Sequence, residues 1–242
     1  MILVLLAFIG FVSAFLQSAI GFGAALVMIN VIPFFLPPFQ AVLIAQFSCL
    51  SFSVYIVVRS FRKIRFDVLI PFLIPAMISS VVATRLSLGL DMSTMKLMLG
   101  ILFVILSLYF SFFAGKISIK PTKTAGIIIG TVSGACNGLF GASGPPSALY
   151  LTPALPDKDE YIATIQAFFM MVSTMSISTR VISGAVSVTD FQYIVPAAAG
   201  AVMGSATGLK ATRKLRGLLL RRLIYAFIGI NGIVIIVTQL YG

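Results

Sequence analysis

The stretch Gly130-Thr-Val-Ser-Gly-Ala-Cys-Asn137-Gly-Leu-Phe-Gly141-Ala-Ser-Gly144-Pro-Pro146 interrupts an apolar region with five glycines, an amide and two prolines. A degenerate copy lies 120 residues earlier, where Ile9-Gly10-Phe-Val-Ser13, Gln17 and Gly21 match Ile129-Gly130-Thr-Val-Ser133, Asn137 and Gly141. In a membrane protein, paired glycine-interrupted segments of this kind indicate a transport site between two repeats.

The match between the two stretches continues into the sequence that follows them. At the same offset, Pro33 matches Pro153, Gln46 matches Gln166 and Ser53 matches Ser173. Each unit is close to half of the 242 residues. The sequence therefore predicts two homologous membrane repeats, residues 1–115 and 121–242, in a single integral membrane domain.

The composition is that of a membrane protein. Hydrophobic residues make up 60% of the chain and charged residues only 10%, and no charged side chain precedes Arg59. Apolar runs of 18 or more residues recur, and a run of that length spans a bilayer as a helix. The runs do not alternate as barrel strands do. We therefore predict an all-α polytopic protein of the cell (cytoplasmic) membrane.

The net charge of +11 reflects basic clusters between the apolar runs. Most of the 17 basic residues fall in three clusters: Arg59, Arg62, Lys63 and Arg65; Lys116, Lys120 and Lys123; Lys210, Arg213, Lys214, Arg216, Arg221 and Arg222. The positive-inside rule places these clusters in the cytoplasm, near anionic lipid headgroups. Nucleic-acid binding is not expected, because no aromatic residues are interleaved with an exposed basic face.

The same charges predict the topology. In the first repeat, the loop at 59–65 is basic and the loop at 85–96 is mixed, whereas their counterparts at 180–190 and 210–222 are nearly neutral and strongly basic. This exchange predicts an inverted repeat, with an odd number of crossings per half and both termini outside. About eight spanning helices are expected in total. The sequence leaves a homo-oligomer open.

The second apolar run of each half is too short to cross the membrane. A run of about 13 residues forms a helix of about 20 Å, against about 30 Å of hydrocarbon. We therefore predict a half-helix after each glycine-rich break. The expected helices are 1–20, 24–36, 41–58, 67–86 and 95–114 in the first half, and 124–141, 145–156, 161–179, 189–209 and 218–240 in the second.

The two breaks carry the candidate substrate-binding residues. Glycine lets the backbone turn and approach a ligand closely, and a restarting helix presents free N–H groups that suit an anion. The candidates are Gln17, Ser18, Gly21, Gly23, Asn137, Gly138, Gly141, Ser143 and Gly144. The alternative is that these glycines only permit close helix packing, which is also the simplest interpretation of Gly200, Gly204 and Gly208.

Three further residues are candidate ligands in the apolar runs. Gln46 and Gln166 lie early in the runs after each break, where a buried amide needs partners: either the substrate or a neighbouring helix. Arg180 stands in the nearly neutral 180–190 loop, where it either attracts an oxyanion or extends to lipid headgroups. Hydroxyl side chains such as Ser53, Ser173 and Ser176 are expected mainly to bond to their own helix.

The residues that are missing bear on mechanism. The chain has no histidine, and its six acidic residues lie near loops, so an enzyme, a metal site or a cofactor is not expected. The absence of a phosphate-binding loop excludes direct ATP use. Each anionic charge that leaves a negative interior gains about 2.3 kcal/mol per 100 mV, so efflux needs no coupling ion. The sequence therefore favours a secondary transporter of a small anion. An anion channel, or a carrier of another organic anion coupled to Na⁺ or H⁺, is the alternative.

The glycine spacing resembles that of the sulfite exporter TauE/SafE family of membrane proteins. The run from Gly130 to Pro146 is similar to that family's glycine-rich segment, and the run from Gly10 to Gly23 is the degenerate first copy. The resemblance implies a membrane transporter of sulfite, organosulfonates or related sulfur oxyanions. The chain departs from the family pattern at Gly23-Ala24-Ala25, where a glycine run is frequent, and at Pro145-Pro146, which replace small residues.

Overall fold

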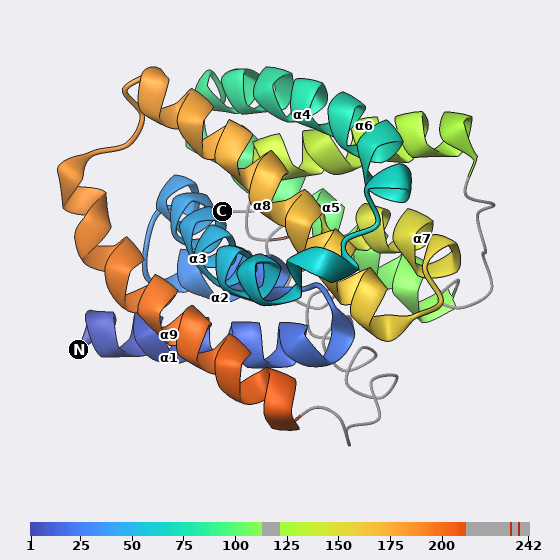
Figure 1. Ribbon diagram of the computed structural model, residues 1–242. Helices are drawn as coiled ribbons and strands as arrows, with labels where there is room; N and C mark the ends of the chain where they lie inside the picture. The colour runs from blue at the N-terminus through green and yellow to red at the C-terminus, as the bar shows by residue number, and fades with distance from the viewer. Residues whose placement is uncertain (113–121, 212–232, 234–236, 238–242) are drawn as a thin grey trace.

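The computed structural model describes residues 1–112 and 122–211, with Ile233 and Val237, and these residues form helices and turns with no β-strand among them (Figure 1). The helices are α1 (Ile2–Ile20), α2 (Ala24–Val31), η1 (Ile32–Phe34), α3 (Pro38–Ser60), η2 (Phe61–Lys63), α4 (Phe66–Leu88), α5 (Met92–Phe112), α6 (Lys123–Phe140), α7 (Gly144–Ala154), α8 (Lys158–Ile182), η3 (Val188–Asp190) and α9 (Phe191–Ala211).

The described helices follow the expected apolar runs closely. Both glycine-rich stretches break a helix, after α1 and after α6, and both breaks are followed by a short helix, α2 or α7. α2 is shorter than the expected 24–36 because it tightens into η1 around Pro33, whose ring removes an N–H from the helix. The expected helix 218–240 lies outside the described residues except for Ile233 and Val237, which are helical.

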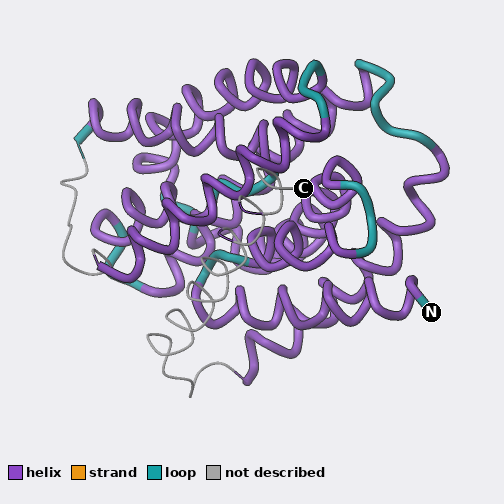
Figure 2. The backbone as a smooth tube through the Cα atoms, turned by 180° about the vertical axis from the view of Figure 1, so that it is seen from behind, coloured by secondary structure: helices purple, strands orange, loops and turns teal. Residues whose placement is uncertain are grey.

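Two long helix pairs flank a central pair. α1 lies along α9, α4 lies along α6, and α3 and α8 pack on each other between these pairs (Figures 1 and 2). A Cβ atom on Gly200 or Gly204 of α9 would collide with carbonyl oxygens of α1, and one on Gly134 of α6 would collide with a carbonyl of α4. The expected packing face on α9 is therefore confirmed, since only glycine allows such a close approach.

The central helices α3 and α8 run in opposite directions. At the end of α3, Lys63 pairs with Asp159, and Arg65 donates to Glu160 at 3.2 Å, both at the start of α8. At the other end of the pair, Gln40 Nε2 donates to Asp190 Oδ1 at 3.1 Å, just beyond the end of α8. The basic cluster of residues 59–65 therefore lies at one end of the bundle and the residues after α8 lie at the other.

Three helices of the described chain are long and apolar enough to cross a membrane: Pro38–Lys63, Phe66–Leu88 and Lys158–Ile182. The expected total of about eight spanning helices stays a prediction. α4 exposes an apolar stripe at every fourth residue, as a lipid-facing helix does; it consists of Ile70, Ile74, Ile78, Val82 and Leu86.

Candidate functional site

The two breaks begin alike, with a glycine at the end of a helix, but they differ two residues later, where Gly23 is left-handed (φ 115°) and Ser143 is not (φ −100°). Gly21 and Gly141 end their helices in the left-handed region, with φ of 92° and 71°, which only glycine adopts without strain. The N–H of Gly21 donates to the carbonyl of Gln17 at 2.7 Å, and the N–H of Gly141 donates to that of Asn137 at 2.7 Å. We call residues 17–23 the first break and residues 137–143 the second break.

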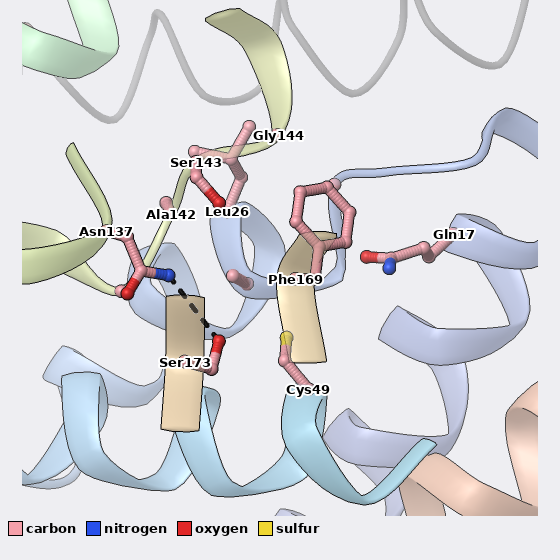
Figure 3. A pocket seen from close by; sticks show the side chains of 12 residues that line it. Gln17, Leu26, Cys49, Asn137, Ala142, Ser143, Gly144, Phe169 and Ser173 are labelled. Carbon is pink, nitrogen blue, oxygen red and sulfur yellow. Dashed lines mark hydrogen bonds between the residues drawn. The ribbon is translucent and has the colours of Figure 1, made fainter. Parts of the chain in front are cut away.

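A small cavity of about 20 Å³ lies where the two breaks meet (Figure 3). Six of the candidate residues line it, together with residues of α2, α3 and α8: Gln17, Gly23, Ala25, Leu26, Cys49, Asn137, Gly141, Ala142, Ser143, Gly144, Phe169 and Ser173. The lining contains neutral hydrogen-bonding groups and no charged side chain. Such a lining offers N–H and O–H donors to the oxygen atoms of a small polar molecule.

Gln17 connects the first break to the cavity. Its side-chain Oε1 accepts the N–H of Ala24 at 2.7 Å and thereby caps the start of α2. Because a backbone N–H can only donate, this bond fixes which end of the amide is oxygen. The Nε2 group makes no hydrogen bond within the described chain, although the residue is only 3% exposed. The cavity wall therefore carries a buried donor without an acceptor.

Asn137 occupies the matching position in the second break but makes different contacts. Its Nδ2 donates to Ser173 Oγ on α8 at 3.5 Å, and its Oδ1 accepts from Ser80 Oγ on α4 at 3.3 Å. Pro145 and Pro146 follow Gly144 in the first turn of α7 and have no N–H, so this turn offers fewer donors than an ordinary helix start.

Each of the two glutamines reaches the break of the opposite half. Gln46 Nε2 on α3 donates to the carbonyl of Asn137 at 3.0 Å and to Ser176 Oγ at 2.8 Å. Gln166 Nε2 on α8 donates to the carbonyl of Gly21 at 3.3 Å, and its Oε1 accepts from Ser53 Oγ at 2.8 Å. The sequence left either the substrate or a neighbouring helix as the partner of each amide. In the structure, both amides bond to groups on other helices or at their ends.

The remaining candidates at the breaks lie outside the cavity lining. Ser18 Oγ donates to the carbonyl of Ala14 at 2.9 Å and faces α9. Gly21 lies against the ring of Tyr161. Gly138 lies against α4, where a Cβ atom would collide with the carbonyl of Ser80. The contact of Gly138 with α4 agrees with the alternative interpretation, in which the glycines permit close helix packing.

Arg180 is buried, which corrects its placement in a loop. It lies in the last turn of α8 with none of its surface exposed, so extension to lipid headgroups is wrong. Its Nη2 donates to the carbonyl of Gly138 at 2.8 Å and to Ser87 Oγ at 3.2 Å, and the guanidinium lies 5.2 Å from the centre of the Phe39 ring. Within the described chain no carboxylate forms an ion pair with it.

Sequence reasoning missed three polar residues on α4. Ser80, Thr84 and Ser87 are buried and lie on one face of the helix. Ser80 contacts Asn137, Thr84 Oγ1 lies 2.8 Å from Ser176 Oγ, and Ser87 contacts Arg180. Their spacing of four and three residues, opposite to the exposed apolar stripe, was the available signal.

These contacts form two facing rows, which we call the polar ladder: Ser80, Thr84 and Ser87 on α4, and Ser173, Ser176 and Arg180 on α8. The ladder runs from the cavity, where Ser173 lies, toward the end of α8. The expectation that such hydroxyls bond to their own helix is wrong for Ser53 and Ser176, which bond to other helices.

The ion pairs of the described chain lie at the other end of the bundle from Arg180, around residues 63–67 and 159–160. Hydrogen bonds with Asp67 and then Glu160 raise the pKa of the Arg65 guanidinium at this end. Among the described residues, no cluster of His, Cys, Asp and Glu side chains is suited to hold a metal ion. The site is therefore described by its hydrogen-bonding groups and the one buried cation beside it.

Comparison with protein families identifies the chain. The family model described as sulfite exporter TauE/SafE matches residues 6–235 and so includes both breaks. The comparisons with curated proteins and with solved structures found no match. The family implies membrane transport of sulfite-type anions. The resemblance seen in the glycine-rich segments is thus confirmed, and the chain belongs to the sulfite exporter TauE/SafE family of membrane transporters.

Proposed function

We propose that this protein is a secondary transporter that carries a small sulfur oxyanion or organosulfonate across the cytoplasmic membrane, and that the substrate binds in the cavity between the two breaks. Membership of the family supports transport of a sulfite-type anion. The cavity supports the location, because residues of both halves line it in the centre of the bundle.

The observation that carries this proposal is the unpartnered Nε2 group of Gln17 in the cavity wall. A buried donor without an acceptor costs about 1–3 kcal/mol. An oxygen atom of an anionic substrate would accept from it and recover that free energy on binding. Ser143 and Ser173 lie in the same wall and supply further donors.

The size of the cavity favours a carrier over an open channel. A volume of about 20 Å³ suffices for one water molecule. A sulfur oxyanion has several heavy atoms and enters only if the walls separate. Each crossed glutamine ties one half of the chain to the break of the other half, so separation at a break would release the bonds of Gln46 or Gln166.

The proposed transporter is an inverted repeat. The packing of α1 on α9 corresponds to that of α6 on α4 under exchange of the halves, and α3 and α8 are antiparallel. These relations support opposite orientations of the two halves. With the basic cluster of residues 59–65 in the cytoplasm, the end of α8 faces outward. Both termini would then lie outside, and a negative interior would favour export of an anion.

The substitution Gln17→Glu tests the proposal. It keeps an oxygen to cap Ala24, but it replaces the free donor by a negative charge that repels an anion. We expect sulfite flux in proteoliposomes to fall about 10–100-fold, the effect of losing one hydrogen bond to a charged group. Gln192→Glu, the same change on the exposed start of α9, is the control and should transport as the wild type does.

Three results would overturn parts of the proposal. If the wild-type protein transports none of sulfite, thiosulfate and sulfoacetate, the proposed substrate class is wrong. If Gln17→Glu transports sulfite at the wild-type rate, the cavity is not the binding site. If the wild-type protein shows single-channel conductance in planar bilayers, the carrier mechanism is wrong.

A further inference from the structure

Arg180 is a buried cation at the outer end of the polar ladder. Its side chain has no exposed surface, and Phe39 covers one face of the guanidinium. A buried charge is costly unless it is paired and hydrogen-bonded. No ion pair to it exists within the described chain. The fold therefore keeps a positive charge in its interior without an internal counter-charge.

The guanidinium also has hydrogen-bonding capacity to spare. An arginine has five N–H donors, and the two on Nη2 are used by Gly138 and Ser87. The Nε and Nη1 groups, which carry the remaining donors, have no partner in the described structure. These donors point to a ligand that supplies oxygen acceptors and negative charge together.

The acidic side chain of the adjoining η3 segment, Asp190, already accepts hydrogen bonds from other residues. Asp190 Oδ1 accepts from Gln40, and its Oδ2 accepts from the N–H of Ser187. This carboxylate stabilises the turn before α9 and forms no ion pair with Arg180. The charge of Arg180 is thus left for a ligand from outside the protein.

We propose that Arg180 forms a second anion-binding site, separate from the cavity between the breaks, which takes a small oxyanion at the outer end of the transport path. This inference rests on the proposed function and adds a second binding site to the proposed transport path. Arg180 binds the anion through its charge and its Nε and Nη1 donors, while Ser87 and Gly138 hold the guanidinium in place.

The polar ladder connects this second site to the cavity. Ser173 lines the cavity, and Arg180 follows it by seven residues on the same helix, a rise of about 10 Å. Ser176 and Thr84 form the rung between them. An anion that leaves the cavity toward the outside would therefore pass hydroxyl groups before it reaches the guanidinium.

The first half lacks an equivalent site. The residue 120 positions before Arg180 is Ser60, and the residue 120 positions before Ser176 is Ile56. Among the described residues, a buried charged site therefore lies at one end of the proposed path. Because neutral groups line the cavity itself, Arg180 is also the buried residue of the described chain that best explains a preference for anions.

The first test compares Arg180→Gln with Arg59→Gln in the full-length purified protein. Both arginines stack on an aromatic ring, Arg59 at 4.5 Å from the Tyr55 ring centre, but Arg59 is exposed at the end of α3. Sulfite affinity is measured from the rise in melting temperature with sodium sulfite concentration, in protein that also carries Gln17→Glu, so that the cavity contributes little to the rise. We expect Arg180→Gln to weaken it about 10–100-fold and Arg59→Gln to leave it unchanged.

A second pair of variants tests the site without removing the arginine. Ser87→Asp places a carboxylate beside the guanidinium, where it competes with the anion, and Ser87→Asn is the neutral control of the same size. We expect Ser87→Asp to raise the melting temperature without ligand and to lose sulfite binding about as fully as Arg180→Gln. A structural role for Arg180 alone would not produce this combination.

The outcomes separate the two proposals. Wild-type protein that binds none of sulfite, sulfate and thiosulfate would contradict the proposed function and this site with it. Sulfite binding of the Gln17→Glu protein that persists within about twofold when Arg180→Gln or Ser87→Asp is added would overturn this site alone. If Arg180→Gln does not fold, the Ser87 pair gives the answer, since selective loss in Ser87→Asp supports the site and equal binding in both variants overturns it.

Discussion

The first break and the second break both begin with a left-handed turn at a glycine but use their amide side chains differently. In the first break, Gln17 turns back to its own chain and caps α2 through the N–H of Ala24. In the second break, Asn137 turns outward and joins Ser80 of α4 to Ser173 of α8. The same position in the two halves thus closes a turn in one case and links three helices in the other.

If the cavity is the binding site that we propose, this difference gives the two halves different roles. The first break presents an unpartnered donor to the cavity, whereas the second break is connected to the polar ladder and to Arg180. In the proposed transporter, a repeated unit supplies the two breaks, and the residues around the second break add a buried positive charge on one side. Measurements on variants of each half test this difference.

The largest effect is expected where the two halves are alike, at the glycines of the long helix pairs. Gly134→Leu would drive a side chain into the Ala76 carbonyl and Ser79, and Gly204→Leu would drive one into the Phe11 carbonyl. Overpacking costs about 1–3 kcal/mol, and more where backbone is hit. We expect neither variant to yield folded protein by size-exclusion chromatography in detergent.

Gly89→Ala is the control for this experiment. A Cβ atom there would lie 3.7 Å from the Leu86 carbonyl, which is ordinary contact, and φ is −91°. This variant should elute as the wild type does. Folded protein from only one of the two leucine variants would show that the helix pairs do not contribute equally to stability.

The next largest effect distinguishes the crossed glutamines. Gln166→Leu leaves the Gly21 carbonyl and the Ser53 hydroxyl without their partner, and we expect a loss of about 1–3 kcal/mol in unfolding free energy. Gln46→Leu also removes bonds, but it removes the unpartnered Oε1 as well, so a smaller loss is expected.

Unfolding in mixed micelles measures both variants against Gln192→Leu, an exposed control that should remain within about 0.5 kcal/mol of the wild type. A larger loss for Gln46→Leu than for Gln166→Leu would reverse the expected order. It would mean that the second break, and not the first, depends more on its crossed glutamine.

The sequence predicted the helix breaks well because a break depends on local chemistry. Left-handed glycines and prolines act on their own turn, so Gly21 and Gly141 could be placed without knowledge of neighbours. The contacts of Gln46, Gln166 and Arg180 could not be placed, because they depend on how distant helices cross. Gln46 lies 91 residues from its partner Asn137 in sequence, and nothing local specifies that pair.

A moderate effect is expected at the start of α8. Asp157 caps this helix by accepting from the N–H groups of Asp159 and Glu160 at 2.9 Å. The matching residue before α3 is Pro37, and α3 starts on Pro38, whose missing N–H needs no cap. We expect Asp157→Ala to lower the unfolding free energy by about 1 kcal/mol, and Asp157→Asn to keep most of the cap. Equal losses in both variants would show that the charge, and not the cap, stabilises this end.

The smallest effect tests whether the polar ladder belongs to one side of the molecule. Thr84→Val keeps the shape of a buried residue but removes the hydroxyl that contacts Ser176, at an expected cost of about 0.5 kcal/mol in unfolding free energy. Ser205 on α9 is equally buried, but its hydroxyl has no partner in the described structure, so Ser205→Ala should be neutral or slightly stabilising. Sulfite flux should fall in Thr84→Val and remain unchanged in Ser205→Ala. If Ser205→Ala lowers stability and flux as much as Thr84→Val does, polar groups on both sides contribute to the path, and the two halves differ less in function than their hydrogen bonds indicate.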